Sequence, residues 1–255
     1  YRDERNPVEV EQGRLSNTNL QGGEPCGALH TRLTLPEGEE KRLQYYLGIT
    51  KGALSDYEKA VAETKNTLQA LRKAGIVEQQ FQKSHAWWQE HLSVLQCQIP
   101  DKDAQRMINT WNPLQSVQTA RFSRSISSSA SGVRGIGFRD SAQDMLAQAY
   151  RKPQWAFEML RYLASQQFED GHPVHIMWPE EKNPAQDVTR SDNHLWLVYL
   201  AYAIIAESGD LTLLDREIPF LAPDKISCTG SATLWEHLLR GVEFTEKHLG
   251  EHGLP

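Results

Sequence analysis

The sequence predicts a mainly α-helical protein, and three observations carry that prediction. From Ser55 onward, apolar residues recur at helical spacing in segments of roughly 10–20 residues, with proline or glycine at most joints. The loops between these segments are alternately short and long, which favours an α/α-toroid over a compact bundle, with the long loops gathered at one end. Segment 191–209 is apolar on almost every side, as is typical of a buried inner helix.

Residues 1–50 have strand character instead. Segments 28–36 and 41–49 are short alternating or aromatic-rich runs, and the Pro-Glu-Gly-Glu sequence at 36–39 is typical of a turn. We therefore predict a β-hairpin here. Because two strands are too few to form a stable domain, we interpret it as the last strands of a β domain.

The helical part can be divided by its start and stop signals. The first helix is predicted to begin at Ser55, because Glu58 follows at the capping-box spacing, and to stop at Gly75. A second helix is expected to end before Pro100, and a third to begin near Asp101. Further helices are predicted at residues 140–150, 153–168, 191–209, 211–221 and 231–250.

The composition excludes several classes of protein. Of the 255 residues, 39% are hydrophobic and 24% are charged, so the chain can bury a sizeable core and is not a disordered chain. No apolar run approaches the roughly 18 residues of a membrane-spanning helix, and the net charge of −6 argues against a nucleic-acid-binding surface. The widely spaced Cys26, Cys97 and Cys228 indicate a reducing compartment, so we expect a cytoplasmic protein.

Segment 132–146 carries the first candidates for function. Arg134, Arg139, Asp140 and Asp144 lie close together in a glycine-rich loop that opens a predicted helix. Acidic residues are favoured at helix N-termini, so capping alone explains the aspartates. The alternative is a carbohydrate subsite, in which carboxylates accept hydrogen bonds from vicinal hydroxyls, guanidinium groups donate to sugar oxygens, and glycines let the ligand approach. The residues by themselves leave both interpretations open.

Two further stretches belong with the glycine-rich loop: Phe122–Ser125 lies just upstream, and Arg190–Trp196 repeats the combination of arginine, aspartate and aromatic residues. The small residues at 124–137 are typical either of a flexible linker or of an ordered loop that lines a site. His172 and His175 are near neighbours, but no third ligand stands at a useful spacing. We therefore predict no metal site and interpret both histidines as loop-packing residues.

Six stretches follow one another in order: NTWNPLQ, FSRS, GVRGIGFRDSAQDML, ASQQFEDG, RSDNHLWL and LDREIPFL. Together they closely resemble the inverting glycoside phosphorylases of glycoside hydrolase family 94, which include cellobiose, cellodextrin, chitobiose and laminaribiose phosphorylases. The resemblance covers nearly the whole chain, and the set of motifs is specific although each motif alone is weak.

The resemblance implies a three-part organisation. Residues 1–50 are similar to the end of the family's N-terminal β-sandwich domain, residues 51–100 to its helical linker, and residues 101–255 to the first half of its (α/α)6 catalytic barrel. It also implies that the chain is a fragment of a longer protein. The family's general acid, an aspartate that follows a His-Gly-Leu-Pro-like turn, is expected beyond Pro255, so no catalytic residue is assigned within the chain.

The resemblance also implies roles for particular residues. Arg124, Arg134 and Asp140 match the family residues that hold the non-reducing-end sugar in subsite −1. Arg139 and Asp192 fall in family-like motifs and are the further substrate-binding candidates. The ionised form of Asp140 is expected to be helped by the neighbouring arginines, and this carboxylate is interpreted as a sugar ligand instead of a base.

The reaction that the resemblance implies is reversible inverting phosphorolysis of a β-linked gluco-disaccharide or oligosaccharide to α-glucose 1-phosphate and a shortened sugar. Inorganic phosphate is the co-substrate, and no cofactor, metal, nucleic acid or membrane is expected. Family membership implies a homodimer. Two alternatives stay open: an inverting hydrolase on the same barrel, which needs a second carboxylate to activate water, and a non-catalytic or synthase-associated carbohydrate-binding module.

Overall fold

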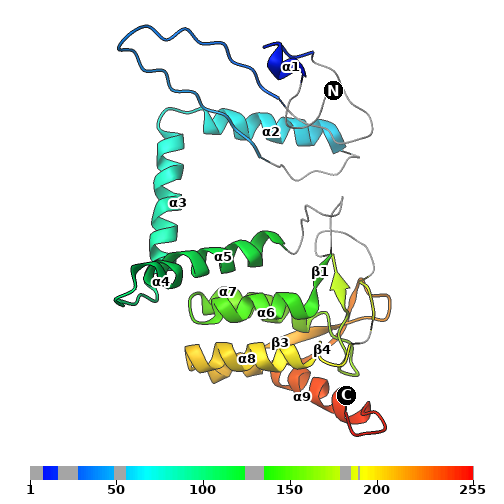
Figure 1. Cartoon of the computed structure of the whole chain (residues 1–255). Coiled ribbons are helices and arrows are strands. Elements are labelled where there is room, and N and C mark those ends of the chain that lie inside the picture. Colours follow the sequence, from blue (N-terminus) through cyan, green and yellow to red (C-terminus); the bar gives the residue numbers. More distant parts are fainter. Residues whose placement is uncertain are drawn as a thin grey trace. The chain divides into compact units, whose positions relative to one another are not determined.

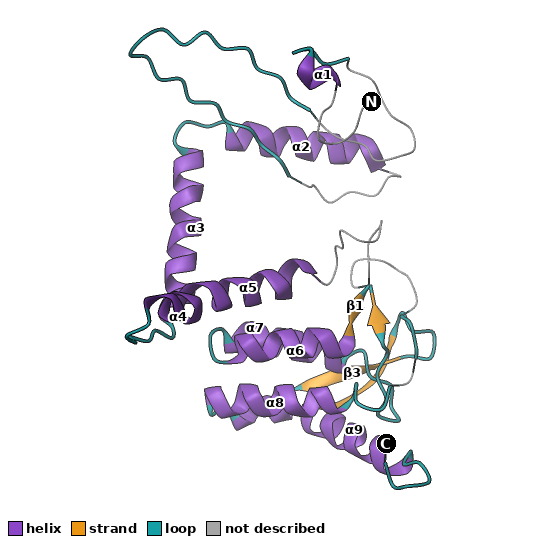
Figure 2. Cartoon of the chain, in the orientation of Figure 1, coloured by secondary structure: helices purple, strands orange, loops and turns teal. Residues whose placement is uncertain are grey.

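The computed structural model describes residues 8–16, 28–48, 56–123, 135–178, 185–188 and 190–254. The chain separates into two compact units, Tyr1–Ala74 and Gly75–Pro255, and each is described by itself (Figure 1). Helices are the main secondary structure, and within the described ranges the strands form two small two-stranded sheets (Figure 2). The predicted mainly α-helical class is therefore confirmed. No helix within these ranges is long and apolar enough to cross a membrane.

The first unit contains two described helices, α1 (Val8–Glu11) and α2 (Tyr57–Leu71), and neither has a buried residue. Ser55, the predicted cap of α2, lies outside the described residues. The position before the helix belongs to Asp56, whose side chain makes no capping hydrogen bond. The capping box of Ser55 and Glu58 therefore stays a prediction.

The predicted β-hairpin of the first unit is wrong where the structure describes it, because residues 28–48 form no strand. The turn itself is present, since the backbone N–H of Glu39 donates to the carbonyl of Pro36 at 3.1 Å. The hydroxyls of Tyr45 and Thr31 also meet across the two arms at 3.1 Å. Nearly all side chains of both arms are exposed, so no apolar face is buried that would support a backbone ladder.

The second unit begins with α3 (Ile76–Ser93). Gly75, which the sequence predicted as the end of the preceding helix, lies directly before α3 at a φ of 77°, a left-handed conformation that glycine adopts without strain. A nearly continuous helical run follows the predicted start at Asp101, whose carboxylate accepts hydrogen bonds from the first-turn backbone. Its parts are α4 (Lys102–Arg106), the π-helical turn η2 (Met107–Trp111), α5 (Asn112–Gln118) and the π-helical turn η3 (Thr119–Ser123).

The core of the second unit lies between α6 (Phe138–Ala149), α7 (Pro153–Ala164) and α8 (Leu195–Ser208), which pack against one another (Figure 1). Apolar residues spaced three and four apart place one stripe of each helix in this core. The largest buried side chains there are Phe138, Met145, Leu160, Leu163, Leu197, Leu200 and Ile204. Burying each of them contributes roughly 1.5–3 kcal/mol. This packing fixes the first turns of α6 and α8 relative to each other.

Helix α8 is confirmed, but the prediction that it is buried on all sides is wrong. Leu197, Leu200 and Ala201 are buried on one side, whereas the side chains of Tyr199 and Tyr202 are 54% and 69% exposed. A tyrosine has an apolar ring and a polar hydroxyl, so it tolerates a position at the surface better than an aliphatic residue does. Mean apolar character alone therefore overestimated the burial of this helix.

Two short sheets complete the second unit. Strand β1 (Ile136–Gly137) pairs antiparallel with β2 (Ile176–Met177), so the residues just before α6 are joined to a segment far along the chain. Strands β3 (Glu217–Leu221) and β4 (Cys228–Thr233) form the second antiparallel pair. Helix α9 (Leu234–Lys247) follows directly and is capped by Thr233, whose hydroxyl accepts from the backbone of its first turn.

The predicted helix at 211–221 is wrong. Leu211–Asp215 forms a short 3-10 helix, and the residues after it form β3. Burial in β3 follows an alternating pattern, with Ile218 and Phe220 buried and Pro219 exposed between them. Proline lacks the N–H that a helix interior requires, which disfavours the helical alternative.

Candidate functional site

The first turn of α6 carries two of the predicted site residues, Arg139 and Asp140. The helix start is fixed because Phe138 is fully buried and its N–H donates to the carbonyl of His175 at 3.0 Å. A Cβ atom at Gly137 would lie 2.6 Å from Oδ2 of Asp140, closer than real Cβ contacts. The glycine therefore leaves the space that this carboxylate occupies, and the carboxylate lies back against the start of the helix.

Gly135, two residues before Gly137, is required for a different reason. A Cβ atom at Gly135 would lie 2.2 Å from Cγ2 of Ile176 and 2.8 Å from Cε2 of Trp178. The backbone here packs directly onto β2 and the residue after it. We expected the glycines of this loop to let a ligand approach, but at Gly135 the absence of a side chain is required by packing.

Arg139 and Asp192 form an ion pair between α6 and the turn that opens α8. Nη1 of Arg139 donates to Oδ2 of Asp192 at 3.0 Å, and the indole N–H of Trp196 donates to the same oxygen at 3.3 Å. Burial raises the pKa of Asp192, but the hydrogen bonds from Arg139 and Trp196 outweigh it, so this pKa lies below its usual value. The carboxylate is therefore ionised at neutral pH. Both charged side chains are about half exposed, at 48% and 42%.

His175 stands beside this pair. Its Nδ1 lies 3.4 Å from the side-chain amide nitrogen of Asn193, whose own side chain is buried. Burial lowers the pKa of His175, and the nearby Arg190 lowers it further. Asp140 and Asp192 are close enough to oppose that shift without reversing it. The imidazole is therefore neutral at neutral pH.

The structure describes three of the five predicted substrate-binding residues, Arg139, Asp140 and Asp192. It brings the first and third into direct contact, and Asp140 is on the same helical turn. Arg124 and Arg134 lie outside the described residues, so their part in the site stays a prediction.

Sequence reasoning missed the contributions of His175, Asn193 and Trp196. His175 was interpreted as a loop-packing residue. Its proximity to α6 depends on the pairing of β1 with β2, which the sequence does not reveal. For the other two, the signal was present: both follow Asp192 within the RSDNHLW stretch, on the turn that opens α8. Asp192 lies in the turn just before α8 and Trp196 is the second residue of that helix, and the indole N–H reaches back to the carboxylate.

His172 is held by a separate group of contacts. Its Nδ1 lies 2.7 Å from Asp170 and its Nε2 lies 3.4 Å from Asp187, while its ring stacks on that of Phe168. Within the described ranges, no group of three His, Cys, Asp or Glu side chains could hold a metal ion. His172 thus joins the parts of its loop through polar contacts and stacking.

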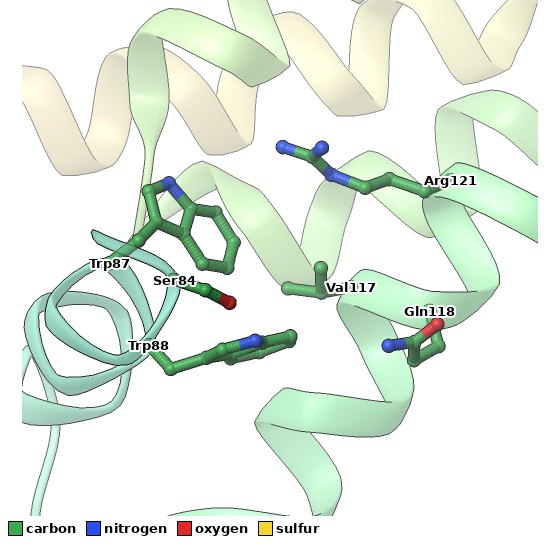
Figure 3. A pocket seen from close by; sticks show the side chains of 6 residues that line it. All are labelled: Ser84, Trp87, Trp88, Val117, Gln118 and Arg121. Atoms are coloured by element: carbon green, nitrogen blue, oxygen red, sulfur yellow. The ribbon is translucent and has the colours of Figure 1, made fainter. Parts of the chain in front are cut away.

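A pocket of about 380 Å³ lies between α3 and the α5–η3 run (Figure 3). Its walls are formed by Ser84, Trp87, Trp88, Val117, Gln118 and Arg121. The guanidinium of Arg121 stacks over the rings of Trp87 and Trp155, at 5.3 and 5.1 Å from their centroids. Among the described residues, the lining contains no carboxylate and no imidazole, the groups most often used for acid–base chemistry.

Comparison with known families agrees with the geometry. The sequence profile of the glycosyl hydrolase 94 superfamily catalytic domain matches residues 87–255, and that of the glycosyl hydrolase 94 supersandwich domain matches residues 1–74. The chain belongs to the glycosyl hydrolase 94 superfamily. The cluster at the start of α6 and α8 lies entirely within the catalytic-domain match of this glycosyl hydrolase 94 chain.

Relatives of this glycosyl hydrolase 94 chain carry names of several enzymes. It is 29% identical over its whole length to N,N'-diacetylchitobiose phosphorylase of Vibrio proteolyticus, covering 33% of that protein. It is 28% identical over its whole length to solabiose phosphorylase of Paenibacillus borealis, covering 30%. It is 27% identical over 97% of its length to the cyclic β-(1,2)-glucan synthase NdvB of Rhizobium meliloti, covering 9%. The chain thus spans about a third of the length of the phosphorylase relatives.

Proposed function

We propose that this chain is part of an inverting glycoside phosphorylase. The cluster at the start of α6 and α8 binds the sugar ring of its substrate. The observation that carries the proposal is the joint placement of the Asp140 carboxylate, the Arg139–Asp192 pair and the neutral His175 at one end of the helical core. Carboxylates accept from sugar hydroxyls, and guanidinium and imidazole groups donate to sugar oxygens. The phosphorylase names of several relatives support the same reading.

The proposed reaction is phosphorolysis of a β-linked gluco-disaccharide or oligosaccharide. A protonated carboxyl group gives its proton to the glycosidic oxygen as that bond breaks. An oxygen of inorganic phosphate forms a bond with the anomeric carbon from the opposite face, which yields the α-glycosyl 1-phosphate and a shortened sugar. Phosphate is already anionic, so no protein base is required. The general acid is expected outside this chain, and the residues described here orient the sugar ring.

Asp140 is assigned the central binding role. An ionised carboxylate forms stronger hydrogen bonds with hydroxyls than a neutral group does, and it accepts from two adjacent hydroxyls at once. Gly137 preserves its place against the helix start. The Arg139–Asp192 pair has solvent on one side and therefore has room for a ligand beside it.

The test is phosphate-dependent release of sugar 1-phosphate by the full-length protein. The substrates are N,N'-diacetylchitobiose and a panel of β-linked glucose disaccharides. Asp140→Asn keeps the shape of the side chain and removes its charge, and we expect kcat/KM to fall about 100-fold, on the order of 2.7 kcal/mol. Asp103→Asn is the matched control, because Asp103 also lies in a first helical turn but its side chain is 94% exposed. Equal activity of wild type and Asp140→Asn would contradict the assignment.

A second candidate function is favoured by one comparison. The match to a cyclic β-(1,2)-glucan synthase covers 97% of the chain, so a synthase-associated carbohydrate-binding module is the alternative. In that case the protein binds glucans without phosphate-dependent release of a sugar 1-phosphate. Release of free sugar without phosphate would instead indicate an inverting hydrolase.

Several expectations belong to this proposal. They are the (α/α)6 barrel with its helical linker and β-sandwich, the three-part division of the chain, the homodimer, the cytoplasmic location, and phosphate as co-substrate without a cofactor. The two-unit division of the chain and the matches to two glycosyl hydrolase 94 domains support a multidomain enzyme of this kind.

A further inference from the structure

The position of His175 is fixed by its backbone on two sides. Its carbonyl accepts from the N–H of Phe138 at 3.0 Å, and its own N–H donates to the carbonyl of Gln186 at 2.8 Å. The first of these bonds ties it to the residue that begins α6, directly before Arg139 and Asp140. Main-chain hydrogen bonds therefore hold His175 next to the first turn of α6, and they do not depend on its imidazole.

The side chain of His175 has a defined tautomer. Nδ1 lies 3.4 Å from the side-chain amide nitrogen of Asn193, and an amide nitrogen only donates hydrogen bonds. Nδ1 of the neutral ring must therefore accept, and the ring proton is on Nε2. Asn193 is only 1% exposed, and its backbone carbonyl accepts from the backbone N–H of Trp196 at 3.2 Å, so its main chain is fixed in the turn that opens α8.

The charged groups around the ring come from two elements. Arg139 and Asp140 face it from α6, and Arg190 and Asp192 face it from the segment before α8. The ring is partly exposed, and Nε2 makes no hydrogen bond to any residue that the structure describes. An N–H that faces neither a protein acceptor nor the core is available to a ligand.

We propose that His175 is a specificity-determining residue of this site, whose Nε2–H donates a hydrogen bond to one hydroxyl oxygen of the bound sugar while Asn193 holds its ring. The inference rests on the proposed function. It extends that function because a carboxylate such as Asp140 only accepts from hydroxyls, whereas discrimination between sugars also needs a donor aimed at one oxygen. A site that hydrogen-bonds a particular hydroxyl rejects the analogue that lacks it.

The experiment pairs variants of His175 with sugars that lack one hydroxyl. In the synthetic direction, the full-length protein is given α-glucose 1-phosphate or its 2-, 3-, 4- or 6-deoxy analogue, with glucose or N-acetylglucosamine as acceptor. We expect His175→Ala to lower kcat/KM about tenfold with the parent compound, in line with one lost hydrogen bond. With one deoxy analogue the same variant has less than about a twofold effect, since the hydroxyl that it contacts is already absent.

Two further variants separate a binding role from a structural one. His175→Gln retains a side-chain N–H and is expected to keep most of the parent activity. His172→Gln is the matched control from the same loop, and we expect its effect to be equal for the parent compound and every analogue. Thermal unfolding of all variants checks that the fold is retained.

The outcomes distinguish this proposal from the one on which it rests. If wild type is active but His175→Ala reduces activity by the same factor with the parent and all four analogues, His175 contacts no hydroxyl and the inference is overturned, while the phosphorylase stands. If wild type uses no sugar 1-phosphate at all, both fail. Loss of the effect with a single analogue, together with retained activity of His175→Gln, supports the inference.

Discussion

At its N-terminal end, helix α6 is surrounded by Arg139, Asp192 and His175; at its C-terminal end, it is surrounded by Arg151 and His91. The residue types are nearly the same at both ends. At the far end, Arg151 is only 4% exposed, and its guanidinium donates to the carbonyl of His91 at 3.0 Å. At the site end, the arginine and the aspartate are about half exposed. Residue type alone therefore does not distinguish the two clusters, whereas their exposure does.

The far end uses its polar groups to join elements. Arg151 also donates to the hydroxyl of Tyr150 at 2.8 Å, and Lys152 forms an ion pair with Glu90 of α3. The ring of His91 is fully buried and stacks on Trp87 with an interplanar angle of 8°. The Tyr150 hydroxyl and the His91 carbonyl accept from the guanidinium and hold it inside the chain, whereas both ring nitrogens of His91 are buried without a hydrogen-bond partner among the described residues. The ion pair of the site end is instead about half exposed, and this is why we propose that end as the ligand site.

The largest effect is expected on stability, when the buried contacts at the C-terminal end of α6 are removed. Arg151→Ala removes a buried donor and leaves the carbonyl of His91 without its partner, so we expect a loss of about 3 kcal/mol in the free energy of unfolding. Chemical denaturation measures this loss. Arg106→Ala, which removes a half-formed surface ion pair at 3.8 Å, is the control and should cost less than about 1 kcal/mol. Unchanged stability of Arg151→Ala would show that the far end does not hold the fold.

The next largest effect is expected on kcat/KM, when the Asp140 carboxylate is displaced from its position beside Gly137. Gly137→Ala places a methyl group where its carboxylate lies, and displacement of a binding group by a fraction of an ångström is expected to lower kcat/KM about 30-fold. Stability should change little, because the backbone φ of Gly137 is ordinary at −76°. Steady-state kinetics provides the measurement. Gly48→Ala is the control, since a Cβ atom there meets nothing within 4 Å.

A smaller effect is expected from the ion pair of the site end. Asp192→Asn removes the charge that holds Arg139 and weakens the bond from Trp196, and we expect kcat/KM to fall about tenfold. The cost in stability should stay below about 1 kcal/mol, because both charged side chains are exposed to solvent. Glu243→Gln, which breaks the exposed pair with Lys247, should change neither quantity. A stability loss in Asp192→Asn without a change in kinetics would make this pair structural.

The smallest effect is a dependence of stability on pH. Burial, followed by nearby cationic groups, holds the pKa of His91 below its usual value, so the folded protein keeps this ring neutral. As the pH falls below about 6.5, the unfolded chain gains a proton that the folded chain does not, and the free energy of unfolding falls. His91→Phe keeps a stacked ring and removes the titration. We expect this variant to lose less stability between pH 7 and pH 5 than wild type; an equal loss would rule out His91 as a contributor.

Local signals explain which parts of the fold were predictable. The start near Asp101 was correct because a cap and its helix lie within one turn of chain. The hairpin of the first unit and the helix at 211–221 were wrong, because strands depend on partners. Segment 28–48 has no buried face, whereas β3 gains its ladder from β4.

The site shows the same division. Arg139, Asp140 and Asp192 could be named as candidates because family-like motifs mark them, and the structure joins two of them, which lie far apart in sequence, in an ion pair. His175 and Asn193 meet only because β1 pairs with β2 and α6 packs on α8. The contact between His175 and Asn193 could not be predicted from the spacing of residues in the sequence. Arg124 and Arg134 stay predictions because they fall outside the described residues.

The most direct test of the central claim is a crystal structure of the full-length protein with a bound sugar 1-phosphate or disaccharide. We expect a pyranose ring at the first turn of α6, with hydroxyls within about 3 Å of the Asp140 carboxylate and of Nε2 of His175. A sugar bound in the pocket lined by Trp87 and Trp88, with the start of α6 unoccupied, would contradict it. In that case the two ends of the helix would have exchanged the roles assigned to them.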